Sequence, residues 1–260
     1  MCKYQLPELL KMALVILCCG LSCFISAQDT LGEGSEKVLI ENADRQITEL
    51  DGDDYTQYLK GNVRVIQDSI FMFCDSAILK KNQLTALGEV VIIQNDTLKI
   101  FADSLYYDGD NRMAELYRGV VLSNKDKNLF TDVMFYNLDD KVAFFPDTCL
   151  LEQKNMKMSS LKASYNIESE MAFFYGKVTA VDDNMNLKTD SLMYDTGIDR
   201  AYFLTSTYIE QGERKIYCED GYYDIQAGRA YFETNPYYWE NDRFAKARSM
   251  YYSERDSITR

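Results

Sequence analysis

Two kinds of residue recur along this chain at an interval of 29 positions, and this period constrains the possible folds more than any other feature. One column holds tyrosines: Tyr107, Tyr136, Tyr165, Tyr194, Tyr223 and Tyr252. The other holds alanines: Ala114, Ala143, Ala172, Ala201 and Ala230. Two independent columns at one period are typical of a repeat protein. We interpret the tyrosines as packing residues; the alternative is a strip that binds sugar or lipid.

Each repeat divides into two extended segments joined by polar turns. The first segment, such as 98–107 or 187–194, is rich in β-branched and aromatic residues and lacks proline, which favours a strand. In the second segment, such as 172–180, apolar residues alternate with other residues, which indicates a strand with one buried face. The turns between segments often begin with Asp or Asn, whose side chain can accept a hydrogen bond from the backbone N–H two residues later and so stabilise a tight turn. The repeats therefore predict an antiparallel meander.

Glycines inside the strands indicate that the meander is bent. Gly61, Gly88 and Gly176 each stand two positions before a valine, and a glycine within a strand marks a bulge or a bend. Pro146 and Pro236 stand near the same position where the glycine is missing. A flat sheet of this size would expose a large apolar face, which soluble proteins avoid. We predict an all-β fold, an elongated antiparallel β-jellyroll or solenoid of bent strands built from 29-residue two-strand repeats.

A stripe of large apolar residues, two positions after each repeated alanine, is expected to line the interior. With the residues beside it, this interior stripe gives the candidate lipid-binding residues: Leu116, Phe145, Phe174, Phe203, Phe232, Val120, Cys149, Val178 and Ile209. Small residues such as Thr131 and Ser160 lie nearby and favour a ligand trough. Composition leaves open whether the interior is filled by its own side chains or has room for acyl chains.

The N-terminus has the layout of a secretory signal peptide. Two lysines flank an apolar run over 12–25, and small residues precede Gln28. The run is shorter than the ~20 residues that cross a bilayer. A lipoprotein signal with a lipidated Cys23 is the alternative. We predict a signal peptide over 1–27, a flexible lead-in over 28–37, a repeat domain over 38–260, and export to the periplasm.

Charge and cysteine content exclude several classes of protein. The chain has 41 acidic and 28 basic residues, a net charge of −13, and no run of Lys or Arg. Such a surface repels nucleic acid and anionic headgroups. Beyond the signal peptide, Cys74, Cys149 and Cys218 lie two or more repeats apart, too far for disulfides in a stacked fold. We expect them to be buried small apolar residues.

Residues that could perform catalysis are scarce. The chain has no histidine, which removes the commonest general base and most zinc sites. It also lacks a glycine-rich phosphate loop and a nucleophile elbow. One acidic column, Asp103, Asp132, Asp190 and Glu219, is interrupted by Leu161 and Arg248. It could serve a carboxylate enzyme acting on polysaccharide or a calcium site, but an exposed acidic position explains it more simply. We expect no enzymatic activity, no cofactor and no metal.

Several short motifs recur together over residues 38–252. They are the opening Ile40-Glu41-Asn42-Ala43-Asp44, the Gly-x-Val elements, and an Ala-Asp or Thr-Asp pair followed by tyrosine, as at Ala102, Thr131 and Thr189. With the signal peptide, this pattern resembles the OstA/LptA-like lipopolysaccharide-transport family, particularly the OstA-like proteins of Bacteroidetes-type bacteria.

The resemblance implies a β-jellyroll whose interior shields lipid A acyl chains in the periplasm and bridges the inner and outer membranes in outer-membrane biogenesis. It also implies edge-to-edge joining with similar jellyroll domains on inner- and outer-membrane components, and is compatible with a homo-oligomer and with outer-membrane association. The chain would be the bridge itself or the periplasmic part of a larger assembly protein. The alternative is a structural β-solenoid scaffold or surface interaction protein with a filled core.

Overall fold

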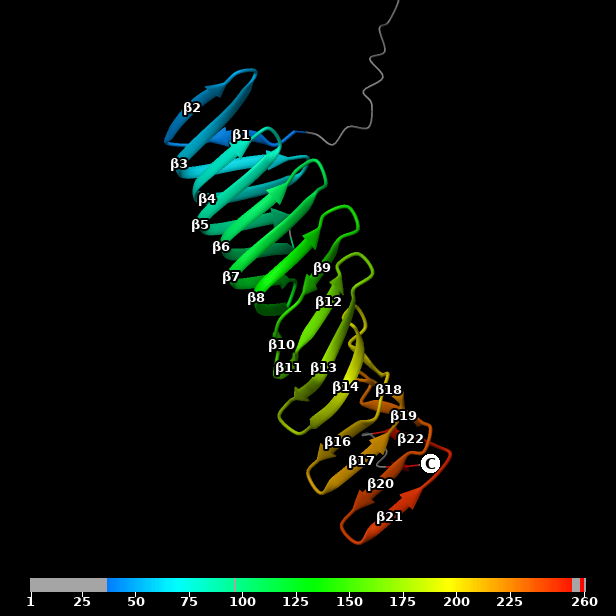
Figure 1. Cartoon of the computed structure of the whole chain (residues 1–260). Helices are drawn as coiled ribbons and strands as arrows, with labels where there is room; N and C mark the ends of the chain where they lie inside the picture. The colour runs from blue at the N-terminus through cyan, green and yellow to red at the C-terminus, as the bar shows by residue number, and fades with distance from the viewer. Residues whose placement is uncertain (1–36, 96, 254–257, 260) are drawn as a thin grey trace, which may run out of the picture. The chain divides into compact units, whose positions relative to one another are not determined.

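The computed structural model describes residues 37–95, 97–253 and 258–259. The predicted signal peptide and almost all of the lead-in therefore lie outside the described residues. Within the described residues, every regular secondary-structure element is a β-strand, and the 23 strands form one hydrogen-bonded sheet (Figure 1). The described part of the chain contains no candidate membrane-spanning helix. The all-β class is confirmed.

Long bent strands form the N-terminal half of the sheet. The first eight strands are β1 (Leu39–Asn42), β2 (Arg45–Asp51), β3 (Asp54–Gln67), β4 (Ile70–Lys80), β5 (Gln83–Gln94), β6 (Leu98–Asp108), β7 (Met113–Asn124) and β8 (Lys127–Asn137). From β3 to β8 each strand pairs antiparallel with the next, and each pairing shifts register near its middle. In β5 the shift falls at Gly88 and Glu89, so the glycine marks the bend as predicted.

In the second half several bends become complete breaks. The remaining strands are β9 (Val142–Phe145), β10 (Cys149–Gln153), β11 (Met156–Ser160), β12 (Lys162–Asn166), β13 (Met171–Val181), β14 (Asn186–Asp195), β15 (Arg200–Phe203), β16 (Thr207–Gln211), β17 (Arg214–Cys218), β18 (Asp220–Asp224), β19 (Arg229–Glu233), β20 (Tyr237–Glu240), β21 (Arg243–Lys246), β22 (Ser249–Ser253) and β23 (Ile258–Thr259). One end of β8 pairs with β9 and the other with β10, with Pro146 in the gap between them. Proline cannot donate to a ladder, so it falls at the break.

Every bent strand, continuous or broken, thus has two arms. The tyrosine arm contains the repeated tyrosines and alanines, and comprises β9, β12, β15, β18, β19, β22 and the corresponding halves of the long strands. The amide arm comprises β10, β11, β16, β17, β20, β21 and the other halves. All pairings among the described strands are antiparallel, and the buried apolar side chains of both arms form one core. The prediction of bent antiparallel two-strand repeats is confirmed.

The tyrosine and alanine columns form a single row across the tyrosine arm. Tyr136 pairs with Ala114 on one neighbouring strand and with Ala143 on the other. The same alternation continues through the later repeats to Tyr252. Tyr107, Tyr136, Tyr165 and Tyr194 are at most 2% exposed. A small alanine on each side leaves the volume that a tyrosine ring fills, so the two columns are two halves of one packing arrangement.

The acidic column lies at the bends. Asp103, Asp132 and Asp190 are exposed there, and no group of three or more His, Cys, Asp or Glu within the described residues could hold a metal ion. Some of the small residues beside this column form hydrogen bonds across the bend. The Thr131 hydroxyl donates to the carbonyl of Val133, and the Ser160 hydroxyl to that of Lys162, in each case across the bend.

One glycine is needed for core packing rather than for a bend. Gly221 pairs with Phe203 on one side and Phe232 on the other, and those two rings stack with centroids 6.2 Å apart. Its φ is +143°, and a Cβ there would lie 2.2 Å from the carbonyl oxygen of Tyr231. The backbone of β19 cannot move aside without breaking the pairing.

We therefore expect Gly221→Ala to lower the free energy of unfolding by about 2–3 kcal/mol, through overpacking against Tyr231 together with the backbone strain of a non-glycine residue at φ +143°. Gly119→Ala is the matched control, because Gly119 has φ +59° and a Cβ added there would have no atom within 4 Å. Its cost should be the backbone term alone, about 1 kcal/mol. Urea unfolding of both variants measures the difference, and equal midpoints would contradict the packing role of Gly221.

Candidate functional site

The nine residues of the interior stripe all lie in the core. Leu116, Phe145, Phe174 and Cys149 are 0% exposed, Val120, Val178 and Phe203 are 1% exposed, and Phe232 and Ile209 are 3% and 5% exposed. The sequence leaves open whether the interior is filled by side chains or has room for a ligand. At these positions it is filled by the protein's own side chains, so an acyl chain could enter only if the two arms moved apart.

The free ends of the two arms meet along a seam that side-chain hydrogen bonds close. The Tyr136 hydroxyl donates to Oε1 of Gln94 at 2.7 Å, and Nδ2 of Asn124 donates to the Tyr165 hydroxyl at 2.9 Å. We call each tyrosine–amide pair across the seam a clasp. The remaining clasps are Tyr194 to Gln153 at 2.7 Å and Tyr252 to Gln211 at 3.1 Å. Gln67 also crosses the seam, since its Nε2 donates to the carbonyl of Gly109.

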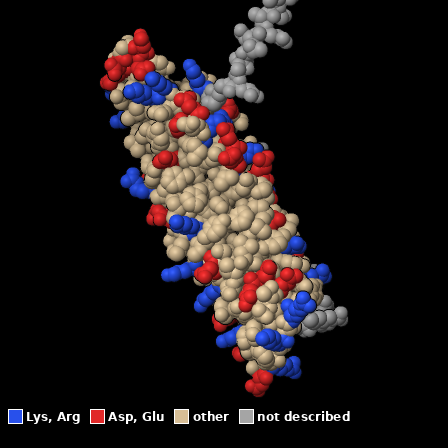
Figure 2. Space-filling model, turned by 45° about the vertical axis from the view of Figure 1, so that its right-hand side comes forward, with Lys and Arg blue, Asp and Glu red and all other residues tan. Residues whose placement is uncertain are grey.

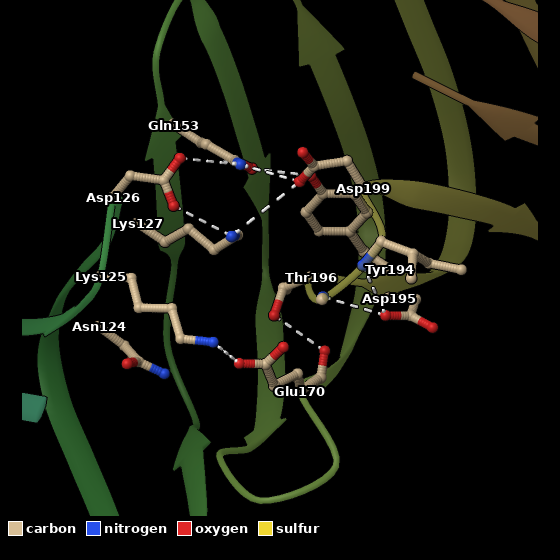
Figure 3. A network of polar contacts seen from close by, with 12 residues as sticks. Asn124, Lys125, Asp126, Lys127, Gln153, Glu170, Tyr194, Asp195, Thr196 and Asp199 are labelled. Atoms are coloured by element: carbon tan, nitrogen blue, oxygen red, sulfur yellow. Dashed lines mark hydrogen bonds and ion pairs between the residues drawn. The ribbon is translucent and has the colours of Figure 1, made fainter. Parts of the chain in front are cut away.

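The clasp at Tyr194 is part of a larger polar network (Figure 3). Nε2 of Gln153 lies 2.9 Å from Oδ1 of Asp199 and 3.3 Å from Oδ2 of Asp126. The Tyr194 hydroxyl lies 2.9 Å from the same oxygen of Asp199. Lys127 contributes an ammonium 3.1 Å from Oδ1 of Asp126 and 4.0 Å from Oδ1 of Asp199. These groups join the turn after β7 to the turn after β14, on opposite sides of the seam.

Ion pairs reinforce the seam on either side of this network. Lys125 pairs with Glu170, as Figure 3 shows, and Arg112 pairs with Asp68 and, at 2.6 Å, with Asp139. On the face drawn in Figure 2, Lys and Arg are interspersed with Asp and Glu, and uncharged side chains extend along the middle. That face therefore offers no basic patch of the kind that binds nucleic acid.

Asp199 is ionised despite its burial. Desolvation acts to raise the pKa of its carboxyl group, but hydrogen bonds from Gln153, Gln226 and Tyr194 and the Lys127 ammonium outweigh it and hold that pKa below its ordinary value. A lowered folded pKa contributes stability at pH values above the unfolded value of ~3.9, and this contribution is lost as pH falls through the folded pKa. The seam should therefore weaken in strong acid.

Removing one clasp hydroxyl should measurably destabilise the fold. Tyr194→Phe deletes the group that bonds to both Gln153 and Asp199, and we expect a loss of about 1–3 kcal/mol because buried acceptors lose a donor. Tyr208→Phe is the control, since Tyr208 is 57% exposed. Urea unfolding of both variants tests this, and equal stability of the two would mean that the clasp contributes nothing.

The amide column was missed in the sequence. Gln67, Gln94, Asn124 and Gln153 recur at nearly the repeat interval and Gln211 follows two intervals later, and that spacing is the signal that could have identified them. Their side chains differ and they stand at strand ends, where polar residues usually begin turns. Only the fold shows that Gln94, Asn124, Gln153 and Gln211 each meet a tyrosine 41 or 42 residues later in the chain, whereas Gln67 meets the backbone of Gly109.

Comparison with known proteins gives a family and a distant structural match. A family model described as OstA-like protein matches residues 35–187. No curated protein matches the chain. Among solved structures, the chain is similar to LptH from Pseudomonas aeruginosa, described as the LptA homologous periplasmic component of the conserved lipopolysaccharide transport device. That match has 13% sequence identity and a TM-score of 0.17, and it covers 62% of this chain and 77% of the other.

Proposed function

The chain belongs to the OstA-like protein family, and from this premise we propose that it acts in lipopolysaccharide transport. In this proposal it is a periplasmic, non-enzymatic protein that shields acyl chains between its two arms and bridges the inner and outer membranes. Lipopolysaccharide, or its lipid A part, is the ligand, and the headgroups stay outside the seam. No cofactor is required.

The interior stripe is the observation that carries this proposal. Each repeat from Leu116 to Phe232 contributes a large apolar side chain to the core between the arms. The clasps are among the contacts that join the free ends of the arms, and a hydrogen bond contributes about 0.5–1.5 kcal/mol net. Burying one methylene contributes about 0.8 kcal/mol, so roughly two methylenes offset the loss of one clasp. An acyl chain is therefore a ligand that can open this seam.

Site-specific photo-crosslinking tests this proposal. A benzophenone amino acid placed at Phe174 points into the core, and the same group at Phe173, on the outward face of β13, is the matched control. After incubation with lipopolysaccharide and irradiation, we expect a lipid adduct at position 174 and little at 173. Equal labelling at both positions would contradict binding between the arms.

The ends of the sheet support joining to other β-domains. Along their whole lengths β2 and β21 are exposed, and among the described strands each pairs with one neighbour, β3 and β20 respectively. Leu50 on β2 is 81% exposed and Phe244 on β21 is 57% exposed. An exposed edge strand with apolar side chains is a template for pairing with another strand. We propose that similar jellyroll domains, or further copies of this chain, pair at these edges.

Edge pairing predicts a specific mutational result. Phe244→Lys should weaken self-association by at least about tenfold, because an edge lysine opposes strand addition. Tyr208→Lys is the matched control, since Tyr208 is equally exposed but lies on β16, which is paired on both sides. Sedimentation equilibrium measures association. A wild-type protein that stays monomeric at millimolar concentration would contradict self-pairing, as would equal effects of the two variants.

A second candidate function is a structural β-solenoid that carries no ligand. The filled interior favours it, because the described structure needs no lipid to complete the packing around the interior stripe. The two candidates differ in whether lipid remains with the purified protein.

A further inference from the structure

A cavity of about 470 Å³ opens on the seam next to the clasp of Tyr194. Its lining includes the clasp residues Gln153 and Tyr194, the carboxylates of Asp182 and Asp199, and the turn residues Lys154 and Asn155. Its volume falls within the range of about 300–1,000 Å³ that small-molecule sites occupy. It lies where the amide arm turns between β10 and β11.

Next to this cavity the seam has a carboxylate where the neighbouring repeats have an amide. One repeat after Gln153, the amide position is occupied by Asp182. The carboxylate oxygen Oδ1 of Asp182 accepts the backbone N–H groups of Asn184 and Met185 at 2.8 and 2.7 Å, within its own turn. This connection, from β13 to β14, spans residues 182–185, whereas the neighbouring connections on the same side have only residues 154–155 and 212–213. The longer turn closes on itself, and the cavity lies beside it.

The cavity is apolar at its inner end. Met156 and Ile225 line it, and both are partly buried and pack against the hydrophobic core. Tyr194, which lines the same cavity, is 1% exposed and is the clasp residue itself. A chain of methylenes lying on Met156 and Ile225 would therefore contact core side chains on one side and the clasp on the other. Displacing that clasp would connect the cavity to the interior.

The rim carries one cation, Lys154, in a cavity whose described lining also includes the carboxylates of Asp182 and Asp199. Among the residues that the structure describes, Lys154 forms no ion pair, although the seam lysines Lys125 and Lys141 pair with Glu170 and Glu168. Lys154 is exposed and stands in the left-handed region with φ 51°. Both lining carboxylates are already engaged, since Asp182 accepts two backbone N–H groups of its own turn and Asp199 accepts three side-chain hydrogen bonds. The Lys154 ammonium beside the apolar floor is therefore the charged group of this lining that can meet the anionic head of a molecule with a hydrocarbon tail.

We propose that this cavity is the port through which the acyl chain of an anionic amphiphile enters the interior. The tail lies on Met156 and Ile225 and displaces the clasp between Tyr194 and Gln153, while a phosphate or carboxylate headgroup stays at Lys154. The inference rests on the proposed function and adds to it the place of entry and the charge of the headgroup.

Uptake kinetics of dansyl-labelled undecanoic acid by the purified protein test the port. Ile225→Trp fills the cavity and should slow the fluorescence rise at least tenfold. Ile167→Trp is the matched control: Ile167 occupies the same turn position two repeats earlier and also packs against the core.

Lys154→Gln tests the headgroup assignment. It changes an exposed side chain, so the fold should persist. It should weaken capture of this carboxylate probe about tenfold, and capture of the uncharged dansyl-labelled alcohol much less.

The outcomes separate the port from the proposed function. If the wild-type protein takes up the probe and Ile225→Trp does so at the same rate, the port is wrong and lipid binding stands. If Lys154→Gln affects the charged and uncharged probes equally, the headgroup assignment is wrong. If the wild-type protein takes up no amphiphile at all, both the port and the proposed function are overturned.

Discussion

Raising the pH above about 10 is expected to unfold this protein steeply, because burial raises the pKa values of three tyrosines of the repeat row, Tyr107, Tyr136 and Tyr194, above that of an exposed tyrosine. Burial raises the pKa of the Tyr107 hydroxyl to about 12. Burial raises the pKa values of Tyr136 and Tyr194 further still, and the nearby Asp199 carboxylate adds to the shift at Tyr194. In the unfolded chain all three hydroxyls ionise near pH 10.

The sign and size of the effect follow from linkage. A folded pKa above the unfolded value means that the stability from the neutral hydroxyl is complete below about pH 10 and is lost as pH rises toward the folded pKa. Each tyrosine that ionises only on unfolding lowers the free energy of unfolding by about 1.4 kcal/mol per pH unit. Three of them together give about 4 kcal/mol per pH unit.

Urea unfolding between about pH 9 and pH 11.5 measures this slope. Tyr136→Phe should reduce it by about a third, since one of three ionising groups is removed. Tyr208→Phe should leave it unchanged, because Tyr208 is 57% exposed and lies outside the buried row. A free energy of unfolding that stays constant across this range would contradict the burial of the tyrosine row.

Truncating one stripe residue should have the second large effect. Phe174 is 0% exposed and lies between Ala163 and Leu192 on the neighbouring strands, so Phe174→Ala leaves a cavity in the middle of the core. The expected loss is about 3–5 kcal/mol of unfolding free energy. The small alanine on one side cannot fill the space, which places the cost at the upper part of this range.

Phe173→Ala is the adjacent control. Phe173 points to the outward face, where its ring stacks on Tyr175 with centroids 6.4 Å apart. Losing that contact should cost about 1 kcal/mol. Thermal or urea unfolding compares the two variants. If Phe173→Ala proved as destabilising as Phe174→Ala, the assignment of the inward face would be wrong.

The period of the sequence was enough to predict the bent antiparallel repeats and the buried face. Alternation around Phe174 and Ala172 assigns them to the interior, and both are buried. The tyrosine column could be assigned to packing for the same reason. Its contact with the alanine column could not be read from the spacing, because the pairing of Tyr136 with Ala114 and Ala143 depends on strand register.

The seam could not be predicted from the sequence. Tyr136 and Gln94 are 42 residues apart and meet only because the two arms of successive strands fold toward each other. The small residues at the bends were interpreted as leaving space for a ligand. The structure gives another reason for their size, since the hydroxyls of Thr131 and Ser160 bond to backbone carbonyls across the bend. Such local bonds leave no trace in hydrophobic periodicity.

Native mass spectrometry of the protein, purified from a host with an outer membrane and then incubated with lipopolysaccharide, decides between a lipid carrier and a ligand-free scaffold. The account predicts a bound mass the size of lipid A or a larger lipopolysaccharide, and a lower bound fraction in Phe174→Ala, which perturbs the stripe. The control Phe173→Ala should retain the wild-type fraction. A protein that shows only its own mass, before and after incubation, would contradict lipid binding between the arms.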